Sequence, residues 1–422
     1  MAEGSATGRW KGIFQSLGPG LLMAGAAIGG SHLVQSTRAG AGWGYTLWWA
    51  VFVACLFKYP FFEFGPRYTA ATGESFLHGY LRLGKWAMAV FLVFTFCTMF
   101  IVEAALTVVT AGLAGEMTGI ALPRLVWASI ILGVCVVILA IGRYPLLDLF
   151  MKIIIVLLAV STVAAVAALL FHGRHVPPQA AARPTWTPAG IAFVVALMGW
   201  MPSIVDISVW YSLWALARGE QTGHRPTLRE SLFDFNLGYI GTFLLAFAFL
   251  ALGALVMFGR GLVFSNNGVH FAGQLVSLYT ASLGGWAGPI IGVAAFTTMF
   301  STTLAVIDAY PRVIREGAAL LSARLSTRRA QSAVYFGTMA LLVAAVLGIL
   351  AFFTSGIKSM MDFATTVSFL TTPVLAYINF KVIGLPNVPG SAAPPKWLRG
   401  LSWAGLAFWT GFAALFVAIR FF

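Results

Sequence analysis

Two short interruptions decide this fold: residues 27–32 read Ala-Ile-Gly-Gly-Ser-His, and residues 199–203 read Gly-Trp-Met-Pro-Ser. Each lies within an apolar stretch long enough to cross a bilayer, at a matching place in the two halves of the chain. Hydrocarbon offers no partner to backbone N–H and C=O groups, so an interrupted helix is tolerated there only where those groups face protein or a watery cavity. Paired interruptions of this kind point to a solute site near the midplane of a membrane transporter.

The composition is that of a polytopic membrane protein. Hydrophobic residues make up 59% of the chain and charged residues 9%, and the mean hydropathy is +0.89. Because about 20 apolar residues cross the hydrocarbon core, we predict an all-α fold, with one transmembrane domain over residues 1–422 and no soluble domain between its spans. The eleven predicted spans are 17–37, 45–65, 87–113, 122–142, 146–171, 190–217, 233–258, 285–310, 331–354, 359–380 and 401–421.

The charges predict an orientation. Short cytoplasmic loops collect Lys and Arg, and most of the 26 such residues fall on the side that holds the N-terminus. We therefore expect an integral protein of the cell (inner) membrane with a cytoplasmic N-terminus and an outer C-terminus. Topology and anionic lipid account for the net charge of +13, so no nucleic-acid partner is needed.

The spans group into two repeats. Five spans in each repeat reverse the second copy relative to the first, so we expect inverted repeats over about 17–171 and 190–380. The helix at about 401–421 is an addition to them.

Three stretches resemble one family. The run GPGLLMAGAAIGGSHLVQSTRAGAGWGY, from Gly18 to Tyr45, is similar to the first span of Nramp metal transporters. Ala71-Thr72-Gly73 resembles that family's segment after the second span, and Met201-Pro202 resembles its sixth. The resemblance implies a LeuT-type fold of two five-helix inverted repeats plus an eleventh helix. It also implies transport of a divalent metal such as manganese, iron or magnesium by alternating access.

The chain departs from that pattern at the positions that bind the metal in the family. Where the family has Asp-Pro-Gly-Asn, whose Asp and Asn ligate the metal, this chain has Gly29, Gly30, Ser31 and His32. A hard cation loses its strongest attraction when the carboxylate is lost. The family's His and Gln ligands also fall on Ser203 and Thr365. We predict an altered substrate site made of Gly29, Gly30, Ser31, His32, Met198, Met201, Ser203, Asp206 and Thr365.

Three of these residues could still ligate a metal. Asp206 is a carboxylate in a predicted span, where a buried charge is costly unless it is paired or used. His32 could ligate a transition metal or carry a proton, and the sulfur of Met201 suits soft metals. The structural alternatives are a backbone partner for Asp206, a helix-terminus hydrogen bond for His32 and packing for Met201.

Further polar residues suggest a coupling ion and a pathway. The hydroxyls of Ser301 and Thr302, with the free carbonyls of Ala27 and Ile28, would suit sodium, as in LeuT-type sodium symporters that they resemble. Back-bonding of the hydroxyls, and proton coupling through His32 or Asp206, are the alternatives. Candidate gate or pathway residues are Glu103, Asp308 and Arg312.

The sequence lacks signatures of an enzyme or of a bound cofactor. It contains no phosphate-binding glycine loop on a soluble strand–helix unit, and no His cluster outside the spans. Two alternatives to metal transport stay open: a sodium- or proton-coupled transporter of a small organic solute, and a transport-incompetent membrane sensor. The sequence leaves the oligomeric state open.

Overall fold

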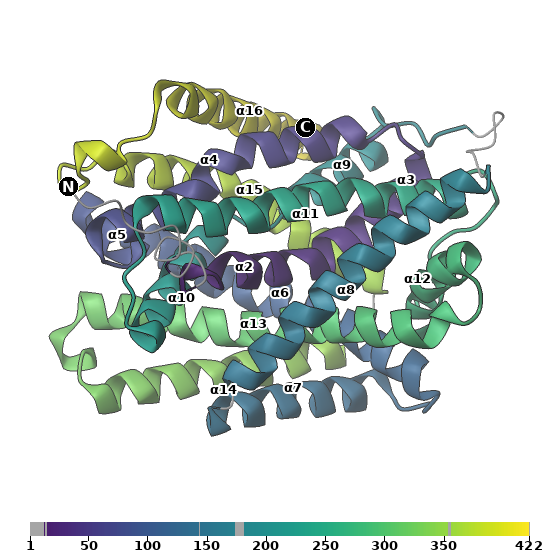
Figure 1. The fold of residues 1–422 in the computed structure, drawn as a ribbon, viewed down its shortest axis with the longest axis horizontal. Coiled ribbons are helices and arrows are strands. Elements are labelled where there is room, and N and C mark those ends of the chain that lie inside the picture. Colours follow the sequence, from purple (N-terminus) through teal and green to yellow (C-terminus); the bar gives the residue numbers. More distant parts are fainter. Residues whose placement is uncertain (1–11, 13–14, 143, 174–180, 353–355, 422) are drawn as a thin grey trace.

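The computed structural model describes residues 12, 15–142, 144–173, 181–352 and 356–421. Its described residues form helices and connecting loops, with no strand among them. The long helices lie roughly along one axis (Figure 1), with the short helix α5 (Phe76–Leu83) at one end and α12 (Gly268–Leu283) at the other. We call these the α5 end and the α12 end of the bundle.

The helices account for all eleven predicted spans. In the first half they are α2 (Pro19–Ala27), a π-helical segment (Ile28–Ser36), α3 (Thr37–Trp43), α4 (Trp48–Thr72), α5, α6 (Lys85–Thr118), α7 (Arg124–Ile141) and α8 (Tyr144–Phe171). In the second half they are α9 (Pro188–Trp200), α10 (Ile207–Thr222), α11 (Leu228–Val256), α12, α13 (Ala287–Leu321), α14 (Arg328–Phe352), α15 (Ile357–Val382) and α16 (Lys396–Phe421).

The two interruptions differ in kind. At the second, α9 ends at Trp200 and α10 begins at Ile207, so residues 201–206 are not helical. At the first, the expectation of an opened helix is wrong, because α2 continues through the π-helical segment into α3. The N–H of Thr37 bonds to the carbonyl of His32, five residues back. A π-helix keeps the backbone bonded while turning side chains to new directions, so glycines at 29 and 30 did not unwind this helix.

The start of α2 is held by the second half of the chain. Asp234 on α11 accepts hydrogen bonds from the N–H groups of Gly18 (3.0 Å) and Gly20 (2.6 Å). Tyr211 on α10 donates its hydroxyl to the same carboxylate at 2.8 Å. A helix N-terminus leaves N–H groups without partners and carries partial positive charge, which explains a buried carboxylate there. Both interrupted spans are thus joined to α11.

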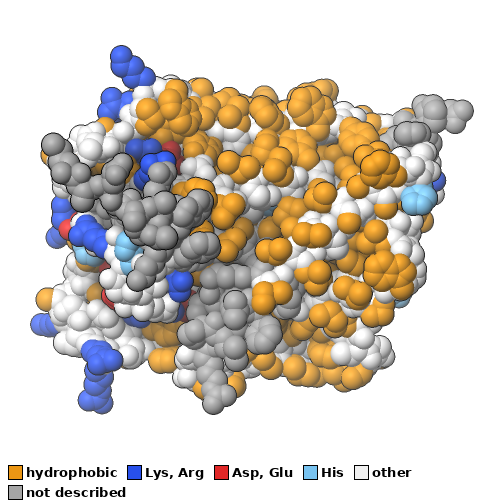
Figure 2. Space-filling view, viewed as in Figure 1, with side chains coloured by type: hydrophobic (Ala, Val, Ile, Leu, Met, Phe, Trp, Pro, Cys, Tyr) orange, Lys and Arg blue, Asp and Glu red, His pale blue; other side chains and the backbone are white. Residues whose placement is uncertain are grey.

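The surface of the bundle suits a membrane. Among the described residues, seven helices are individually long and apolar enough to cross a membrane, and the interrupted spans consist of shorter helices. Figure 2 shows apolar side chains over most of the visible face, with Lys and Arg gathered at the α5 end.

Candidate transport site

The gap between α9 and α10 is built around a buried cation. Lys58 of α4 is fully buried, and its ammonium donates to the carbonyls of Met198 (2.9 Å), Gly199 (2.7 Å) and Ser203 (3.0 Å). The last carbonyls of a helix lack helical partners and carry partial negative charge, so an ammonium satisfies them well. The ammonium also lies 5.2 Å from the centre of the Trp409 ring of α16. Lys58 therefore stabilises the non-helical backbone directly.

A small cavity lies beside this gap. Its volume is about 20 Å³, and its lining is neutral: Ala26, Ala27, Gly30, Ser31, Val102, Leu106, Trp200, Ser203, Ile204, Trp210 and Val306. Ser31 donates to the carbonyls of Ala27 and, at 3.0 Å, Pro202, which joins the two interrupted spans. The Trp200 indole packs on Gly30, where an added Cβ would lie 2.5 Å from the ring. The site thus combines one small space, two serine hydroxyls and two tryptophan rings.

His32 points away from this cavity. Its Nε2 lies 2.7 Å from the carbonyl of Thr242 on α11, and its Nδ1 lies 2.5 Å from the Ser31 hydroxyl. A carbonyl only accepts, so Nε2 carries the proton and Nδ1 is left with a lone pair. That lone pair faces the Ser31 hydroxyl, whose single hydrogen is shared with the carbonyls of Ala27 and Pro202. Both ring nitrogens are occupied, and the ring also meets Phe249 edge-on. In this arrangement the Nδ1 lone pair of His32 is directed at Ser31, and His32 is not among the residues that line the cavity.

The other candidate substrate residues surround the gap without lining the cavity. Met198 and Met201 are fully buried, and Asp206 is 6% exposed at the start of α10. The charge of Asp206 acts on Lys58, although the two form no ion pair within 4.0 Å among the described residues. Thr365 of α15 donates to the carbonyl of Met361 at 2.8 Å. The three candidate metal ligands His32, Met201 and Asp206 are therefore not gathered around the cavity.

The candidate coupling residues lie on α13 against α2. Thr302 donates its hydroxyl to the carbonyl of Gly25 at 2.9 Å and to that of Thr298 at 3.1 Å. An added Cβ at Gly29 would lie 2.4 Å from this hydroxyl oxygen. Thr302 therefore contacts the first span through the carbonyl of Gly25. It does not bond to the carbonyls of Ala27 or Ile28, because the helix is not opened there. Ser301 is buried on the same helix.

The candidate gate residues lie in two places. Asp308 of α13 is fully buried and accepts from Arg312 (2.6 Å) and from Tyr335 of α14 (2.6 Å). Glu103 of α6 is also fully buried, and Thr107 donates to one of its oxygens at 3.1 Å. The other oxygen of Glu103 has no hydrogen-bond partner among the described residues.

A second ionic contact, which the sequence did not indicate, joins two helices toward the α12 end. Arg38 of α3 bonds to both carboxylate oxygens of Asp362 on α15, at 2.7 and 2.9 Å. Gln35 accepts from Arg38 at 2.7 Å and donates to Asp362 at 3.1 Å and to Thr365 at 3.3 Å. A charged residue so near the first interruption was the available signal for Arg38.

The comparisons with known proteins agree with this architecture. An uncharacterized protein of Pasteurella multocida is 38% identical over 416 residues, which is 97% of this chain and 93% of that protein. A manganese transporter of Eremococcus coleocola has a solved structure, of a mutant form, that matches 98% of this chain and 88% of its own at 14% identity and a TM-score of 0.74. MhsT in complex with L-phenylalanine matches 96% of this chain and 98% of its own at 16% identity and a TM-score of 0.59.

The structural matches confirm the predicted fold class, a LeuT-type inverted repeat of five and five helices with one more helix. The family model described as natural resistance-associated macrophage protein-like covers residues 20–418. This integral membrane transporter therefore belongs to the Nramp family.

Proposed function

We propose that this chain moves a metal cation across the membrane by alternating access around the gap between α9 and α10, through a site altered from the family pattern. The size of the cavity at the gap carries this proposal. Its volume of about 20 Å³ is enough for one water-sized particle. A single ion fits such a space, whereas an organic solute does not fit without rearrangement.

Two ionic contacts between helices support alternating access. Asp308 with Arg312 and Tyr335 joins α13 and α14, whereas Arg38 with Asp362 joins α3 and α15. The Arg38–Asp362 contact joins the first interrupted span to α15, so it would break if these two elements separated to open the α12 end. The Lys and Arg at the α5 end (Figure 2) favour that end as cytoplasmic, and so favour a cytoplasmic N-terminus.

A small organic solute is the second candidate, because the site is poor in metal ligands. Among the described residues, His, Cys, Asp and Glu side chains form no group of three that could hold an ion. The hydroxyls of Ser31 and Ser203 and nearby backbone carbonyls would be the ligand atoms available at the cavity. An aromatic-lined site without carboxylate ligands also suits an uncharged or zwitterionic solute.

Uptake into liposomes tests the function. Purified protein is reconstituted and offered manganese, iron, magnesium and small organic cations, under imposed sodium or proton gradients. We expect uptake of manganese. Uptake of an organic solute alone would favour the second candidate, and no uptake of any solute would favour the transport-incompetent sensor. Dependence on sodium would support Ser301 and Thr302 as coupling residues; acceleration by a proton gradient would support Asp206 or His32.

Asp206→Asn tests the one carboxylate beside the gap. The substitution keeps the size of the side chain and removes the negative charge that acts on Lys58. A buried charge without its counter-charge is costly, so we expect uptake to fall by at least about tenfold, the effect of about 1.4 kcal/mol. The measurement is the initial uptake rate in liposomes. Glu220→Gln, exposed on the same helix α10, is the matched control, and unchanged kinetics for Asp206→Asn would leave Asp206 a structural role.

A further inference from the structure

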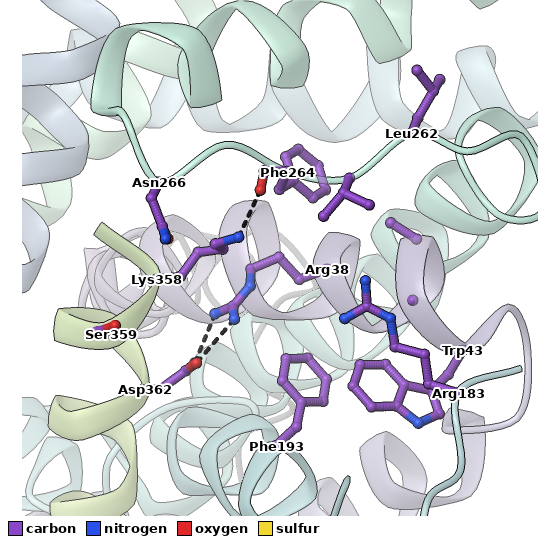
Figure 3. Close-up of a pocket in the computed structure, with 13 residues that line it drawn as sticks. Arg38, Trp43, Arg183, Phe193, Leu262, Phe264, Asn266, Lys358, Ser359 and Asp362 are labelled. Atoms are coloured by element: carbon purple, nitrogen blue, oxygen red, sulfur yellow. Dashed lines mark hydrogen bonds and ion pairs between the residues drawn. The ribbon is translucent and has the colours of Figure 1, made fainter. Parts of the chain in front are cut away.

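A second, larger pocket opens at the α12 end of the bundle (Figure 3). Its volume is about 270 Å³, just below the roughly 300 Å³ at which small-molecule pockets begin, so it suits a ligand of about ten heavy atoms. Five parts of the chain meet there: α3, the loop before α9, α9 itself, the loop between α11 and α12, and the first two turns of α15.

The lining is strongly cationic. Arg38, Arg183 and Lys358 face the pocket, and Asp362 is the one acidic residue in the described lining. Arg38 already holds both oxygens of that carboxylate, at 2.7 and 2.9 Å. The pocket therefore presents uncompensated positive charge, and Arg38 and Arg183 both act on Lys358 as like charges.

Two of these cations have donors to spare. The guanidinium of Arg183 makes no hydrogen bond or ion pair with any described residue, and the side chain is exposed. The ammonium of Lys358 donates once, to the carbonyl of Phe264 at 2.7 Å, and has further hydrogens for a ligand. Both groups lie on the wall of the pocket in Figure 3.

Aromatic rings hold the guanidinium groups in place. Trp43 and Phe193 stack with centroids 4.4 Å apart and planes 11° apart. The Arg183 guanidinium lies 5.6 Å from the Trp43 ring, and that of Arg38 lies 5.2 Å from the Phe193 ring. The backbone N–H of Arg183 also donates to the carbonyl of Gly42 at 3.4 Å. Because these side chains are already held in place, less side-chain entropy is lost when a ligand binds.

We propose that this pocket binds a small organic anion: a carboxylate attached to an apolar or aromatic group. Arg183 and Lys358 would hold the carboxylate, because charge-assisted hydrogen bonds to carboxylates are strong and Arg can form two in parallel. Leu262 and Val263, which are 50% and 55% exposed, would cover the apolar part. A bare divalent cation would be repelled, since the single carboxylate is already paired. The site is separate from the cavity at the α9–α10 gap.

Binding to the full-length protein in detergent tests this proposal, measured by calorimetry at low salt without metal or any gradient. The probes are phenylacetate, phenylacetamide, which lacks the charge, and acetate, which lacks the ring. We expect phenylacetate to bind with a Kd below about 1 mM, and both other probes to bind at least about tenfold more weakly. Added salt should weaken phenylacetate binding, because the Debye length shortens.

Variants assign the binding to this pocket. Arg183→Gln and Lys358→Gln should each weaken phenylacetate binding by about 10- to 100-fold, the range for a hydrogen bond to a charged group. Arg260→Gln removes an exposed cation from the loop after α11, outside the lining, and should leave the Kd within about twofold. Thermal unfolding of each variant verifies the fold.

Equal binding of phenylacetate and phenylacetamide, no binding of phenylacetate, or full affinity in folded Arg183→Gln would overturn the proposal. This experiment measures binding and not transport, so its result can be interpreted even if the proposed metal uptake fails.

Discussion

Lys58→Met is expected to abolish uptake and to lower the thermal stability of the protein strongly. The substitution keeps an unbranched side chain of similar length but removes the ammonium that bonds Met198, Gly199 and Ser203. The Met198 carbonyl keeps a second partner, the N–H of Met201 at 3.3 Å, so two carbonyls lose the partner seen here. At about 1–3 kcal/mol for each buried group left unpaired, the cost is about 2–6 kcal/mol. Relief from burying a charge offsets part of this cost, but the helix terminus remains unsatisfied.

The measurement is the unfolding temperature in detergent together with the initial uptake rate in liposomes. Lys381→Met is the matched control, since Lys381 is exposed near the end of α15 and its ammonium lies 5.5 Å from the Tyr377 ring. It should change neither quantity by much, as expected for an exposed residue. A stable, active Lys58→Met protein would show that the α9–α10 gap does not depend on the ammonium.

Gly199→Ala is expected to be nearly as damaging, for a steric reason. An added Cβ at this position would lie 1.9 Å from the backbone carbonyl oxygen of Thr365 and 3.2 Å from Phe369. A backbone atom cannot turn aside as a flexible side chain can, so α9 and α15 must separate. Overpacking of this kind costs about 1–3 kcal/mol, occasionally more, and the shift would also move the Gly199 carbonyl away from Lys58.

Gly133→Ala supplies the matched control for this prediction. Gly133 lies on α7, where an added Cβ meets nothing within 4 Å, and alanine is favoured over glycine within a helix by roughly 0.5–1 kcal/mol. We expect Gly133→Ala to unfold at the same temperature as the parent or slightly higher, and Gly199→Ala to unfold well below it with little uptake. Equal unfolding temperatures for the two variants would contradict the close approach of α9 and α15.

The sequence predicted most of the fold because membrane spans are a local property. Hydrocarbon requires long apolar helices, and every predicted span has its helix in the structure. The gap after Trp200 could also be predicted from the sequence, since Pro202 lacks an N–H and disfavours helix in the residue before it. The family assignment followed from motifs that are contiguous in the chain, from Gly18 to Tyr45.

The site was less predictable because its contacts are distant in sequence. Ser31, Gly30 and Ser203 do line the central cavity, and they belong to the set of residues that the sequence predicted as a substrate site. His32 belongs to that set but turns to Thr242, 210 residues away. No local pattern specifies which face of a π-helix a side chain takes. The roles of the remaining candidates, including Glu103 and Asp308, stay predictions.

The sequence by itself determined the class of the protein: apolar length, the paired interruptions and the first-span motif were enough for a LeuT-type transporter of this family. Only the tertiary structure decided what occupies the gap. An ammonium from α4 reaches carbonyls 140, 141 and 145 residues away, and cations from α3, α15 and a loop converge on one pocket. Hydrogen bonds and charges act through space over a few ångströms, so their partners are set by how the helices pack and not by their order in the chain.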